Sequence, residues 1–579
     1  MNRRGEYPWL ELYAPSTPIC IRHLLGKDLV QLIEESCVQH ASRVAFYSLG
    51  GALSYAHLQQ LSKDFCAWLL AQGLQPGERV ALMMPNLMQY VVALIGVLRA
   101  GGVVVTCNPL YTPRELRALL QDAQPRFLVV ARPFVSTAHA AMALCQEKGG
   151  EPFSSLALVV TNIGDLQSGF QRHWLNCLTR FRGRHSTQNR RLCGRYRSVQ
   201  TYSFLQVLRQ GRKITIREPK LQPDQAAFLL YTGGTTGRPK GVVLSHENMV
   251  ANLYQVSTWL APKLNADQEM VLTVLPMYHI FSLLGNCLLF LFLGASNVLI
   301  PDGRQLSQVI KAFKRYPITA FTGVNTLFKQ LLLREEFRRL HFTHLNLVIG
   351  GGAAVEESVA TQWEEVTGQP LLQAYGLTET APAVCMNPVL GQHKKAALGL
   401  PLPSTEVRIM NEQGAPMPFY ACGEIGVRGP QVMQGYFHAA DNQSAFTGDG
   451  FFRTGDMGYM DEQGFVYLQE RKNDIINVSG FQVFPTEIEA VIGQLPEVSA
   501  VAVIGVPDQE QGECIYAFVQ LGQNARGAQR DLEKRIRQLC QHNLTQYKMP
   551  AKIIFVSDLP VSAVGKVLRR ELRSECHFL

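Results

Sequence analysis

Residues 231–241 read Tyr-Thr-Gly-Gly-Thr-Thr-Gly-Arg-Pro-Lys-Gly and directly follow the apolar run Ala226–Leu230. The pattern predicts a strand that leads into a loop, because glycine allows the dihedral angles through which successive backbone N–H groups converge on an anion. The spacing does not match a Walker A loop. A plain surface turn is the alternative, but the hydroxyls and the cation favour a polyphosphate site, made of Thr232, Gly233, Gly234, Thr235, Thr236, Gly237 and Lys240.

The size and composition of the chain are those of a large enzyme with more than one domain. Its 579 residues exceed what a single hydrophobic core organises. The 13 cysteines occur singly, without a C-x-x-C pair, which argues against a zinc site and a disulfide framework and fits a reducing cytoplasm. The first residues carry no apolar signal core, and the C-terminal Cys-His-Phe-Leu is not a peroxisomal address.

Short β-branched runs alternate with helical patterns along most of the chain, which predicts layered α/β sheets with mainly parallel strands. After about residue 423 the segments become shorter and richer in turns, which predicts a β-rich subdomain. From Asp474 onward we expect a small α+β domain, with helices at Pro485–Ile492 and Gln529–Asn543. The expected domains are therefore 1–472 and 474–579.

One apolar segment is long enough to cross a bilayer, because residues 271–300 contain no Asp, Glu, Lys or Arg. Pro276, His279 and Asn286, together with two glycines, interrupt it. We therefore predict a buried strand, a loop that carries His279, a buried helix over Leu283–Phe292 and a second strand.

A basic stretch stands out between Asp165 and Glu218, where the chain has twelve Arg or Lys residues and no acidic one. We interpret about 166–217 as an insertion. Trp174 and other apolar residues at helical spacing beside these charges are typical of a segment that binds anionic membrane. A solvated, partly disordered insertion is the alternative. Nucleic acid is not expected as a partner, because no stacking platform or groove-reading motif accompanies the arginines.

Six ordered blocks resemble those of the adenylate-forming ligases, a superfamily that includes acyl-CoA synthetases. They are residues 231–241, 350–353, 375–379, 454–456, 471–480 and 560–569. Residues 108–116 and the Gly480–Phe481 pair are most similar to bacterial long-chain fatty acyl-CoA synthetases. The resemblance implies ATP-dependent formation of an acyl adenylate and its transfer to coenzyme A. The alternatives are a ligase that delivers its product to a carrier protein, a medium-chain or aryl acid CoA ligase, and an inactive lipid-binding relative.

The resemblance also assigns the nucleotide site. Glu379 is expected to hold Mg²⁺ and to act in catalysis with Thr235, while Thr378 contacts the α-phosphate. Asp456 is expected to accept hydrogen bonds from the ribose hydroxyls, and Arg471 to bind ribose or phosphate. Residues expected to surround ATP or AMP on the adenine side are Gly351, Gly352, Ala353, Gln373, Ala374, Tyr375 and Gly376.

The remaining assignments concern the acyl group, the thiol and the C-terminal domain. The resemblance makes Lys566 the catalytic lysine of a mobile C-terminal domain that turns about a hinge at Asn473. His279 is expected beside the substrate carboxylate, with Val324, Asn325 and Thr326 around the acyl chain. Residues expected to line the approach of coenzyme A are Val478, Ser479 and Gly480. We expect a cytoplasmic enzyme that associates peripherally with the inner face of the cell membrane, and the sequence leaves a homodimer open.

Overall fold

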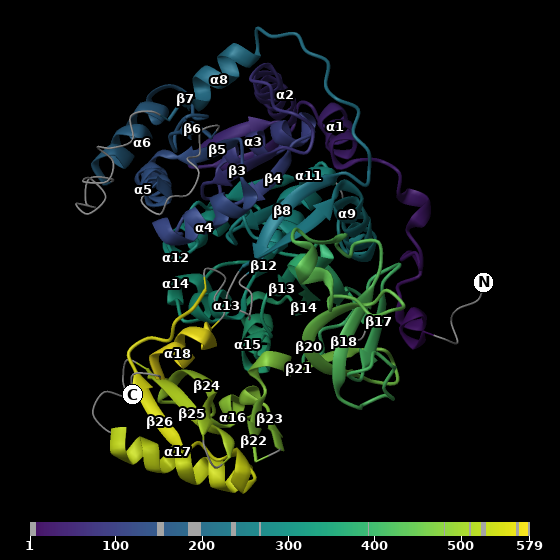
Figure 1. The fold of residues 1–579 in the computed structure, drawn as a ribbon, viewed down its shortest axis with the longest axis vertical. Helices are drawn as coiled ribbons and strands as arrows, with labels where there is room; N and C mark the ends of the chain where they lie inside the picture. Colours follow the sequence, from purple (N-terminus) through teal and green to yellow (C-terminus); the bar gives the residue numbers. More distant parts are fainter. Residues whose placement is uncertain are drawn as a thin grey trace.

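The computed structural model describes residues 7–146, 156–182, 199–232, 239–265, 268–391, 393–479, 481–508, 511–522, 529–562 and 567–576. Figure 1 shows a large N-terminal domain above a small C-terminal domain, which is drawn in yellow-green to yellow. The predicted fold class, α/β layers with a β-rich part and a small α+β domain, is confirmed.

An eight-stranded sheet carries the predicted phosphate loop. Its strands run in the order β19-β9-β8-β4-β3-β5-β6-β7, and the six from β8 to β7 are parallel. They are β3 (Arg79–Met83), β4 (Val103–Thr106), β5 (Phe127–Ala131), β6 (Ala157–Thr161), β7 (Thr201–Ser203), β8 (Ala226–Thr232), β9 (Lys240–Ser245) and β19 (Gly435–Tyr436). Because β8 and β9 pair antiparallel up to Thr232 and Lys240, the glycine-rich stretch joins two neighbouring strands.

A nine-stranded sheet forms the second large layer, in the order β16-β15-β14-β13-β12-β10-β11-β1-β2. The strands from β14 to β1 are parallel. The members are β1 (Val44–Ser48), β2 (Gly51–Ser54), β10 (Met270–Thr273), β11 (Ser296–Leu299), β12 (Ala320–Gly323), β13 (Leu347–Gly350), β14 (Leu371–Gly376), β15 (Ala383–Met386) and β16 (Leu400–Pro401).

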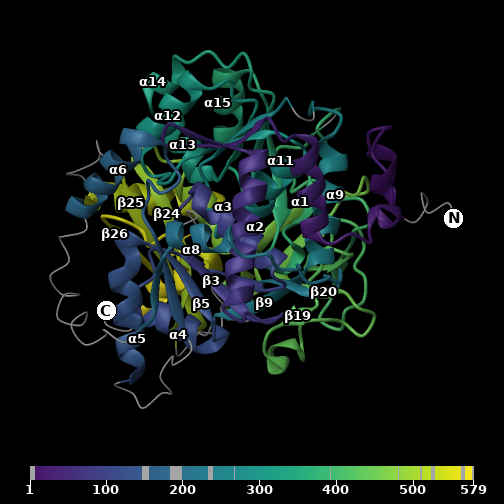
Figure 2. The ribbon, with the colours of Figure 1, turned by 90° about the horizontal axis from the view of Figure 1, so that it is seen from above.

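Helices fill the space between the two sheets and cover their outer faces. Every residue of α3 (Met88–Arg99) is buried, because α3 contacts β3 and β4 of one sheet and β1 of the other. In Figure 2, α3 lies beside α2 (Tyr55–Ala71), which packs in turn against α1 (Leu29–Gln39). The other helices of the large domain include α4 (Pro113–Ala123), α5 (Val135–Gln146), α9 (His246–Leu260), α12 (Leu306–Arg315), α13 (Asn325–Leu332), α14 (Glu335–Arg338) and α15 (Glu357–Thr367).

The β-rich part of the large domain is an antiparallel sheet of four strands, in the order β17-β18-β20-β21. Buried and partly exposed residues alternate along β20, as expected for a sheet with one face against the core. The strands are β17 (Glu406–Met410), β18 (Gly423–Arg428), β20 (Phe452–Met460) and β21 (Val466–Arg471).

The C-terminal domain follows a single 3₁₀ turn, η8 (Lys472–Asp474), that contains the predicted hinge residue Asn473. The two helices expected there are confirmed as α16 (Pro485–Ile492) and α17 (Gln529–Asn543). The domain is completed by α18 (Arg569–Cys576) and five strands: β22 (Ile476–Val478), β23 (Phe481–Val483), β24 (Val498–Asp508), β25 (Gly512–Leu521) and β26 (Lys552–Val556). The boundary at residue 473 stays a prediction.

The apolar segment 271–300 is folded into the nine-stranded sheet, as predicted. Between β10 and β11 the chain forms α10 (Ile280–Ser282), a π-helical turn η5 (Leu283–Leu288) and α11 (Leu289–Phe292). The expected helix thus begins three residues earlier and includes a π-helical turn, which its composition did not reveal. Among the helices that the structure describes, none combines the length and apolar character needed to cross a membrane.

The structure describes the first and the last part of the basic stretch. Its first part forms α6 (Gly169–Arg182), the helix predicted from the apolar spacing, on which Trp174 is 53% exposed. Its last part belongs to the fold: β7 pairs with β6, and α8 (Phe204–Gly211) packs on α2 with Phe204 and Val207 buried. Residues 201–211 are thus part of the folded domain, and the interpretation of about 166–217 as an insertion stays a prediction. Residues 183–198, with five of the arginines, lie outside the described residues.

Candidate active site

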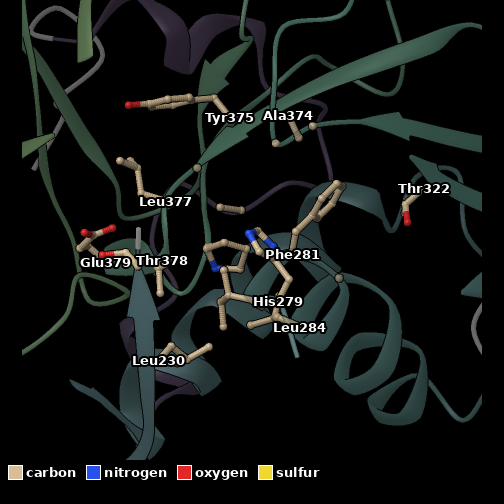
Figure 3. Close-up of a pocket in the computed structure, with 18 of the residues that line it drawn as sticks. Leu230, His279, Phe281, Leu284, Thr322, Ala374, Tyr375, Leu377, Thr378 and Glu379 are labelled. Carbon is tan, nitrogen blue, oxygen red and sulfur yellow. The ribbon is translucent and has the colours of Figure 1, made fainter. Parts of the chain in front are cut away.

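A cavity of about 550 Å³ lies where the large sheets, the β-rich sheet and the C-terminal domain meet. It opens at the carboxyl ends of parallel strands, where open α/β sheets commonly bind ligands. One part of its wall is polar, with Thr232, Lys240, Thr378, Glu379 and Arg471, and another is apolar. Figure 3 shows Glu379 and Thr378 on one side of the cavity, and Phe281, Leu284 and Thr322 on the other.

The two ends of the predicted phosphate loop reach this cavity. Thr232 ends β8 and Lys240 begins β9, and both line the wall. Tyr231 lines it too, and its hydroxyl donates a hydrogen bond of 2.6 Å to Asp122. The residues between the two strands that were assigned to the loop lie outside the described residues; they are Gly233, Gly234, Thr235, Thr236 and Gly237.

Asp456, which is 2% exposed, is held by two partners at the edge of the cavity. The hydroxyl of Tyr375 donates to Oδ2 of Asp456 at 2.7 Å, and Nε of Arg471 lies 3.1 Å from Oδ1. Burial, with the Asp456 charge beside it, raises the pKa of Tyr375 well above its usual value, so the phenol stays a donor. The Asp456 carboxylate raises the pKa of Arg471, which stays charged.

Most residues expected on the adenine side line the cavity, and two do not. Gly351, Gly352, Ala374, Tyr375 and Gly376 belong to its wall. The Gln373 side chain accepts a hydrogen bond from the backbone N–H of Val355 and donates one to the carbonyl of Lys395. It therefore holds the loop 351–355, which follows β13, without lining the cavity. Ala353 lies on the exposed side of the same loop.

Glu379 presents a buried carboxylate to the polar part of the cavity. Tyr436 donates a hydrogen bond of 3.0 Å to its Oε1, and the backbone N–H of Met433 donates to its carbonyl oxygen. Burial raises the pKa of Glu379, and the Tyr436 hydrogen bond opposes that shift. Lys240 Nζ lies 4.9 Å from the centre of the Tyr436 ring, so a cation lies over the ring whose hydroxyl binds the Glu379 carboxylate.

The apolar part of the cavity has a different wall from the one we expected. His279 lines it, but Val324, Asn325 and Thr326 do not. Val324 is buried in the core cluster that also contains Phe321, and Asn325 pairs with Glu356 on the surface. The roles of these three residues around the acyl chain therefore stay predictions. The residues that form the apolar wall include Leu230, Val256, Leu260, Ile280, Phe281, Leu284, Gly285, Leu289, Phe290, Phe321, Leu347, Ile349 and Met386.

The missed residues come from several distant elements, so no local motif marks them. Leu284 and Gly285 belong to the π-helical turn η5, and π-helical turns often occur at functional sites. Polar contacts fix this turn in place: Oγ1 of Thr322 donates to Oδ1 of Asn286 at 2.9 Å, and Nδ2 of Asn297 donates to the carbonyl of Asn286.

The C-terminal domain contributes to the cavity through Ser562, Val567 and Leu568. Lys566, expected beside them, lies outside the described residues. Val478 is buried in β22 and Ser479 follows it with a φ of 50°, and neither residue lines the cavity in this arrangement. Gly480 lies outside the described residues.

Comparisons with known proteins agree with this arrangement. Residues 33–437 match the model of the AMP-binding enzyme family, and residues 487–566 match the AMP-binding enzyme C-terminal domain. The chain is 41% identical over 571 residues to a long-chain-fatty-acid–CoA ligase of Escherichia coli O6:H1, covering 98% of each chain. A ligase of the same name from Bacillus subtilis is 33% identical, over 99% of this chain and 98% of its own.

A solved structure gives the same result for the fold. ATP-bound MatB from Rhodopseudomonas palustris superimposes with a TM-score of 0.77 at 28% identity, over 95% of this chain and 99% of that one. Sequence and structure thus match over nearly the whole length, in both domains. The chain belongs to the AMP-binding enzyme family.

Proposed function

We propose that this protein is an AMP-forming long-chain fatty acyl-CoA ligase. One observation carries the proposal: a single cavity joins a polar wall suited to a nucleoside triphosphate with a buried apolar wall suited to an acyl chain. The 41% identity to long-chain-fatty-acid–CoA ligases supports the substrate class.

In the first half-reaction, a carboxylate oxygen of the fatty acid attacks the α-phosphorus of ATP. The bond from that phosphorus to the bridging oxygen breaks, and pyrophosphate leaves with the electron pair. Negative charge grows on phosphate oxygens, so preorganised donors and cations lower the barrier. We propose that the leaving pyrophosphate is bound by Thr232, Lys240 and the loop residues Thr235 and Thr236. Thr378 is proposed to contact the α-phosphate.

Asp456 and Arg471 are proposed to bind the ribose, with Tyr375 beside the adenine. Asp456 is acceptor-only when ionised, so it can take hydrogen bonds from both ribose hydroxyls. The contacts from Tyr375 and Arg471 that hold it support this role, because a fixed carboxylate loses little freedom when the nucleotide binds. Gly351, Gly352, Ala374 and Gly376 leave room for a flat base.

The donor set around Glu379 fits Mg²⁺. This ion prefers oxygen ligands, keeps several waters and is usually held by one or two carboxylates together with substrate phosphates. Within the described ranges no three His, Cys, Asp or Glu side chains gather around a common point, so a site made of protein ligands alone is not seen there. Glu379 would hold the ion, which supplies positive charge next to the phosphates when bound.

In the second half-reaction, the sulfur of coenzyme A attacks the acyl carbon, the thiol proton leaves, and the bond to AMP breaks. Lys566 is proposed to serve only the first step, by neutralising the two negatively charged reactants. A rotation of the C-terminal domain about Asn473 would then replace it with Val478, Ser479 and Gly480. The position of Val478 and Ser479 outside the present cavity wall is what such a switch requires.

His279 is proposed to lie beside the substrate carboxylate, at the start of the apolar wall. The many apolar side chains beyond it suit a long alkyl chain, since each buried CH₂ group contributes about 0.8 kcal/mol. A longer acid should therefore bind more tightly until the chain fills the cavity.

A substrate screen tests the proposal. Purified protein with ATP, Mg²⁺ and coenzyme A is given fatty acids from acetate to oleate, and AMP and acyl-CoA are measured together. We expect the highest kcat/KM with long chains and a dependence on both Mg²⁺ and coenzyme A. Adenylate formation without any use of coenzyme A would identify a ligase for a carrier protein instead, and a preference for short or aromatic acids would reject the long-chain assignment.

We also propose peripheral binding to anionic membrane at the cytoplasmic face, where long-chain fatty acids concentrate. The exposed Trp174 on α6 and the run of arginines that follows support this, since basic and apolar side chains together suit a lipid interface. A role in fatty acid metabolism follows from the proposed reaction. A homodimer stays a further expectation, which analytical ultracentrifugation would test.

A further inference from the structure

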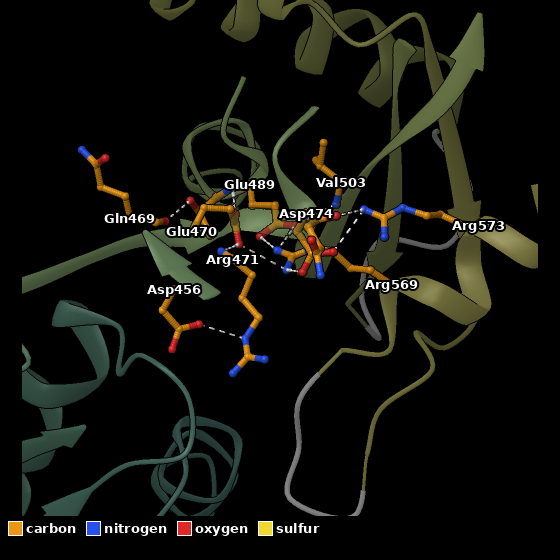
Figure 4. Close-up of polar contacts among 11 residues, drawn as sticks. Asp456, Gln469, Glu470, Arg471, Asp474, Glu489, Val503, Arg569 and Arg573 are labelled. Atoms are coloured by element: carbon orange, nitrogen blue, oxygen red, sulfur yellow. Dashed lines mark hydrogen bonds and ion pairs between the residues drawn. The ribbon is translucent and has the colours of Figure 1, made fainter. Parts of the chain in front are cut away.

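The structure contains a polar cluster at the point where the two domains join. Figure 4 shows Glu470, Asp474 and Glu489 converging around Arg569. Nη2 of Arg569 binds both carboxylate oxygens of Glu489, at 2.8 and 2.9 Å, and Nη1 lies 3.4 Å from Asp474 and 3.6 Å from Glu470. One turn further along α18, Arg573 binds the other oxygen of Asp474 at 3.1 Å.

Only part of this cluster crosses between the domains. Glu470 is the residue before Arg471 on β21, which pairs with β20 in the large domain. Arg569 and Glu489 belong to the helices α18 and α16 of the small domain. The contact between Glu470 and Arg569 therefore joins the two bodies, whereas the Arg569–Glu489 pair stays within the small domain.

A second crossing contact lies at the start of α16. Phe484 occupies the N-cap position of this helix and has no side-chain oxygen to accept a hydrogen bond. Glu470 supplies the missing acceptor from the other domain, because its Oε2 accepts the backbone N–H of Thr486 at 3.1 Å. The hydroxyl of Thr486 donates to the backbone carbonyl of Gln469 at 3.0 Å. The first turn of α16 is thus capped by β21.

The cluster also connects to the cavity. α18 begins at Arg569, directly after Val567 and Leu568, which line the cavity. Leu568 is tied by its backbone N–H to the carbonyl of Pro560. A displacement of α18 relative to β21 would therefore move the segment that closes the cavity on the side of the C-terminal domain.

We propose that Gln469, Glu470 and Thr486 form an interdomain latch that positions the C-terminal domain for adenylate formation. The latch residues are not part of the cavity wall, so they act through the orientation of the domain. The latch is broken whenever α16 moves away from β21, and the other domain orientation must do without it. The inference rests on the proposed two-step reaction.

The test is Thr486→Val, which keeps the shape of the side chain and removes its hydrogen bond. ATP–pyrophosphate exchange reports the first half-reaction, and thioester formation from supplied acyl adenylate reports the second. We expect exchange to fall about fivefold, the loss typical of one capping contact, with the second half-reaction unchanged or faster. Thr486→Ser, which keeps the hydroxyl, should restore exchange.

A matched control removes a hydroxyl–carbonyl bond that stays inside the small domain. Oγ of Ser499 donates to the carbonyl of Gln520 at 3.0 Å, so Ser499→Ala should leave both half-reactions as in the unchanged protein. An equal loss of both half-reactions in Thr486→Val, or no change in either, would overturn the latch.

A readout independent of activity separates the latch from the proposed reaction. Lys472 lies in the connection between the domains, and its side chain is 47% exposed. Mass spectrometry measures the rate of tryptic cleavage after Lys472. Thr486→Val should raise this rate about fivefold, whereas Ser499→Ala should leave it unchanged. Unchanged cleavage would contradict the latch. If the unaltered protein shows no pyrophosphate exchange at all, the proposed reaction fails, and the cleavage rates still decide on the latch.

Discussion

The hydroxyl of Tyr436 donates a hydrogen bond of 3.0 Å to Oε1 of Glu379. Tyr436 is itself fixed at both backbone groups, because the Asn442 side chain accepts from its N–H and donates to its carbonyl. A phenol held so firmly sets the direction of the carboxylate. Its raised pKa, caused first by burial and then by the nearby Glu379 charge, keeps the proton on the phenol.

The first prediction is that Tyr436→Phe weakens binding of the magnesium–nucleotide complex. The ring over Lys240 remains, but Glu379 loses the donor that orients it. We expect about tenfold weaker binding in calorimetric titration, the low end for a hydrogen bond to a charged group. Tyr467→Phe is the matched control, since Tyr467 donates to Asp461 at 3.1 Å and does not line the cavity. Equal affinity of both variants for the magnesium–nucleotide complex would show that Tyr436 does not contribute to its binding.

The second prediction concerns Lys566. Lys566→Ala should lower the rate of adenylate formation by about three decades, close to 4 kcal/mol of barrier, because its charge neutralises the two anionic reactants in the transition state. Thioester formation from supplied acyl adenylate should persist. Lys548→Ala removes a lysine of the same domain that is paired with Glu487, and should leave both steps intact. Normal adenylation by Lys566→Ala would refute the assignment.

The third prediction is a loss of stability in mild acid, caused by His246. This side chain is 1% exposed, and burial lowers its pKa to about 4. Within the described residues its Nδ1 has no hydrogen-bond partner. Between about pH 6.5 and pH 4 the unfolded chain binds a proton there that the folded chain does not, so the free energy of unfolding falls as the pH falls.

The expected effect of His246 is up to about 3 kcal/mol across that interval. Urea unfolding at pH 7 and pH 5 should detect about 2 kcal/mol of it. His246→Leu should reduce the difference between the two pH values, whereas the same change at the exposed His344 provides the control. An unaltered pH dependence in His246→Leu would show that other groups dominate.

The fourth prediction is that binding to vesicles depends on the basic stretch. Each basic residue near an anionic surface contributes about 1 kcal/mol, and salt screens the attraction. Co-sedimentation should rise with the fraction of anionic lipid and fall steeply with salt. Replacing five arginines with glutamine should release the protein while turnover of a short, soluble acid persists; the five are Arg180, Arg182, Arg184, Arg190 and Arg191.

A control variant removes the same number of exposed positive charges from the region of α12 to α14. These are Lys311, Lys314, Arg315, Arg334 and Arg338. The control should still sediment with anionic vesicles. Equal binding of the unaltered protein to neutral and anionic vesicles would contradict the electrostatic account.

Local patterns explain why much of the fold could be predicted. The capping box of Thr112 and Glu115, with Pro113 in the first turn, marks the start of α4 in the sequence as it does in the structure. Strands such as β4 are continuous apolar runs with clear ends. β7 escaped prediction because it has three residues and partly exposed side chains, so only its pairing with β6 defines it.

The candidate site also has a part that the sequence predicts and a part that it does not. Tyr375, Glu379 and Asp456 belong to short blocks with recognisable composition, and all three meet in or beside the cavity. The apolar wall could not be predicted, since Val256, Phe321 and Met386 come from three elements and resemble any other core residue. Tyr436 was missed because it reaches Glu379 from 57 residues further along the chain.

The small domain has a hydrophobic core of its own. Its two buried clusters, the larger with Ile476 and Ile536 and the smaller with Ile504 and Leu572, contain no residue that precedes Ile476 among those the structure describes. Two interiors without shared members favour unfolding as separate cooperative units, so we expect two endotherms in a heating scan. A substrate that binds to both domains should bring the two melting temperatures closer together. The difference between them therefore reports how strongly the substrate couples the two domains.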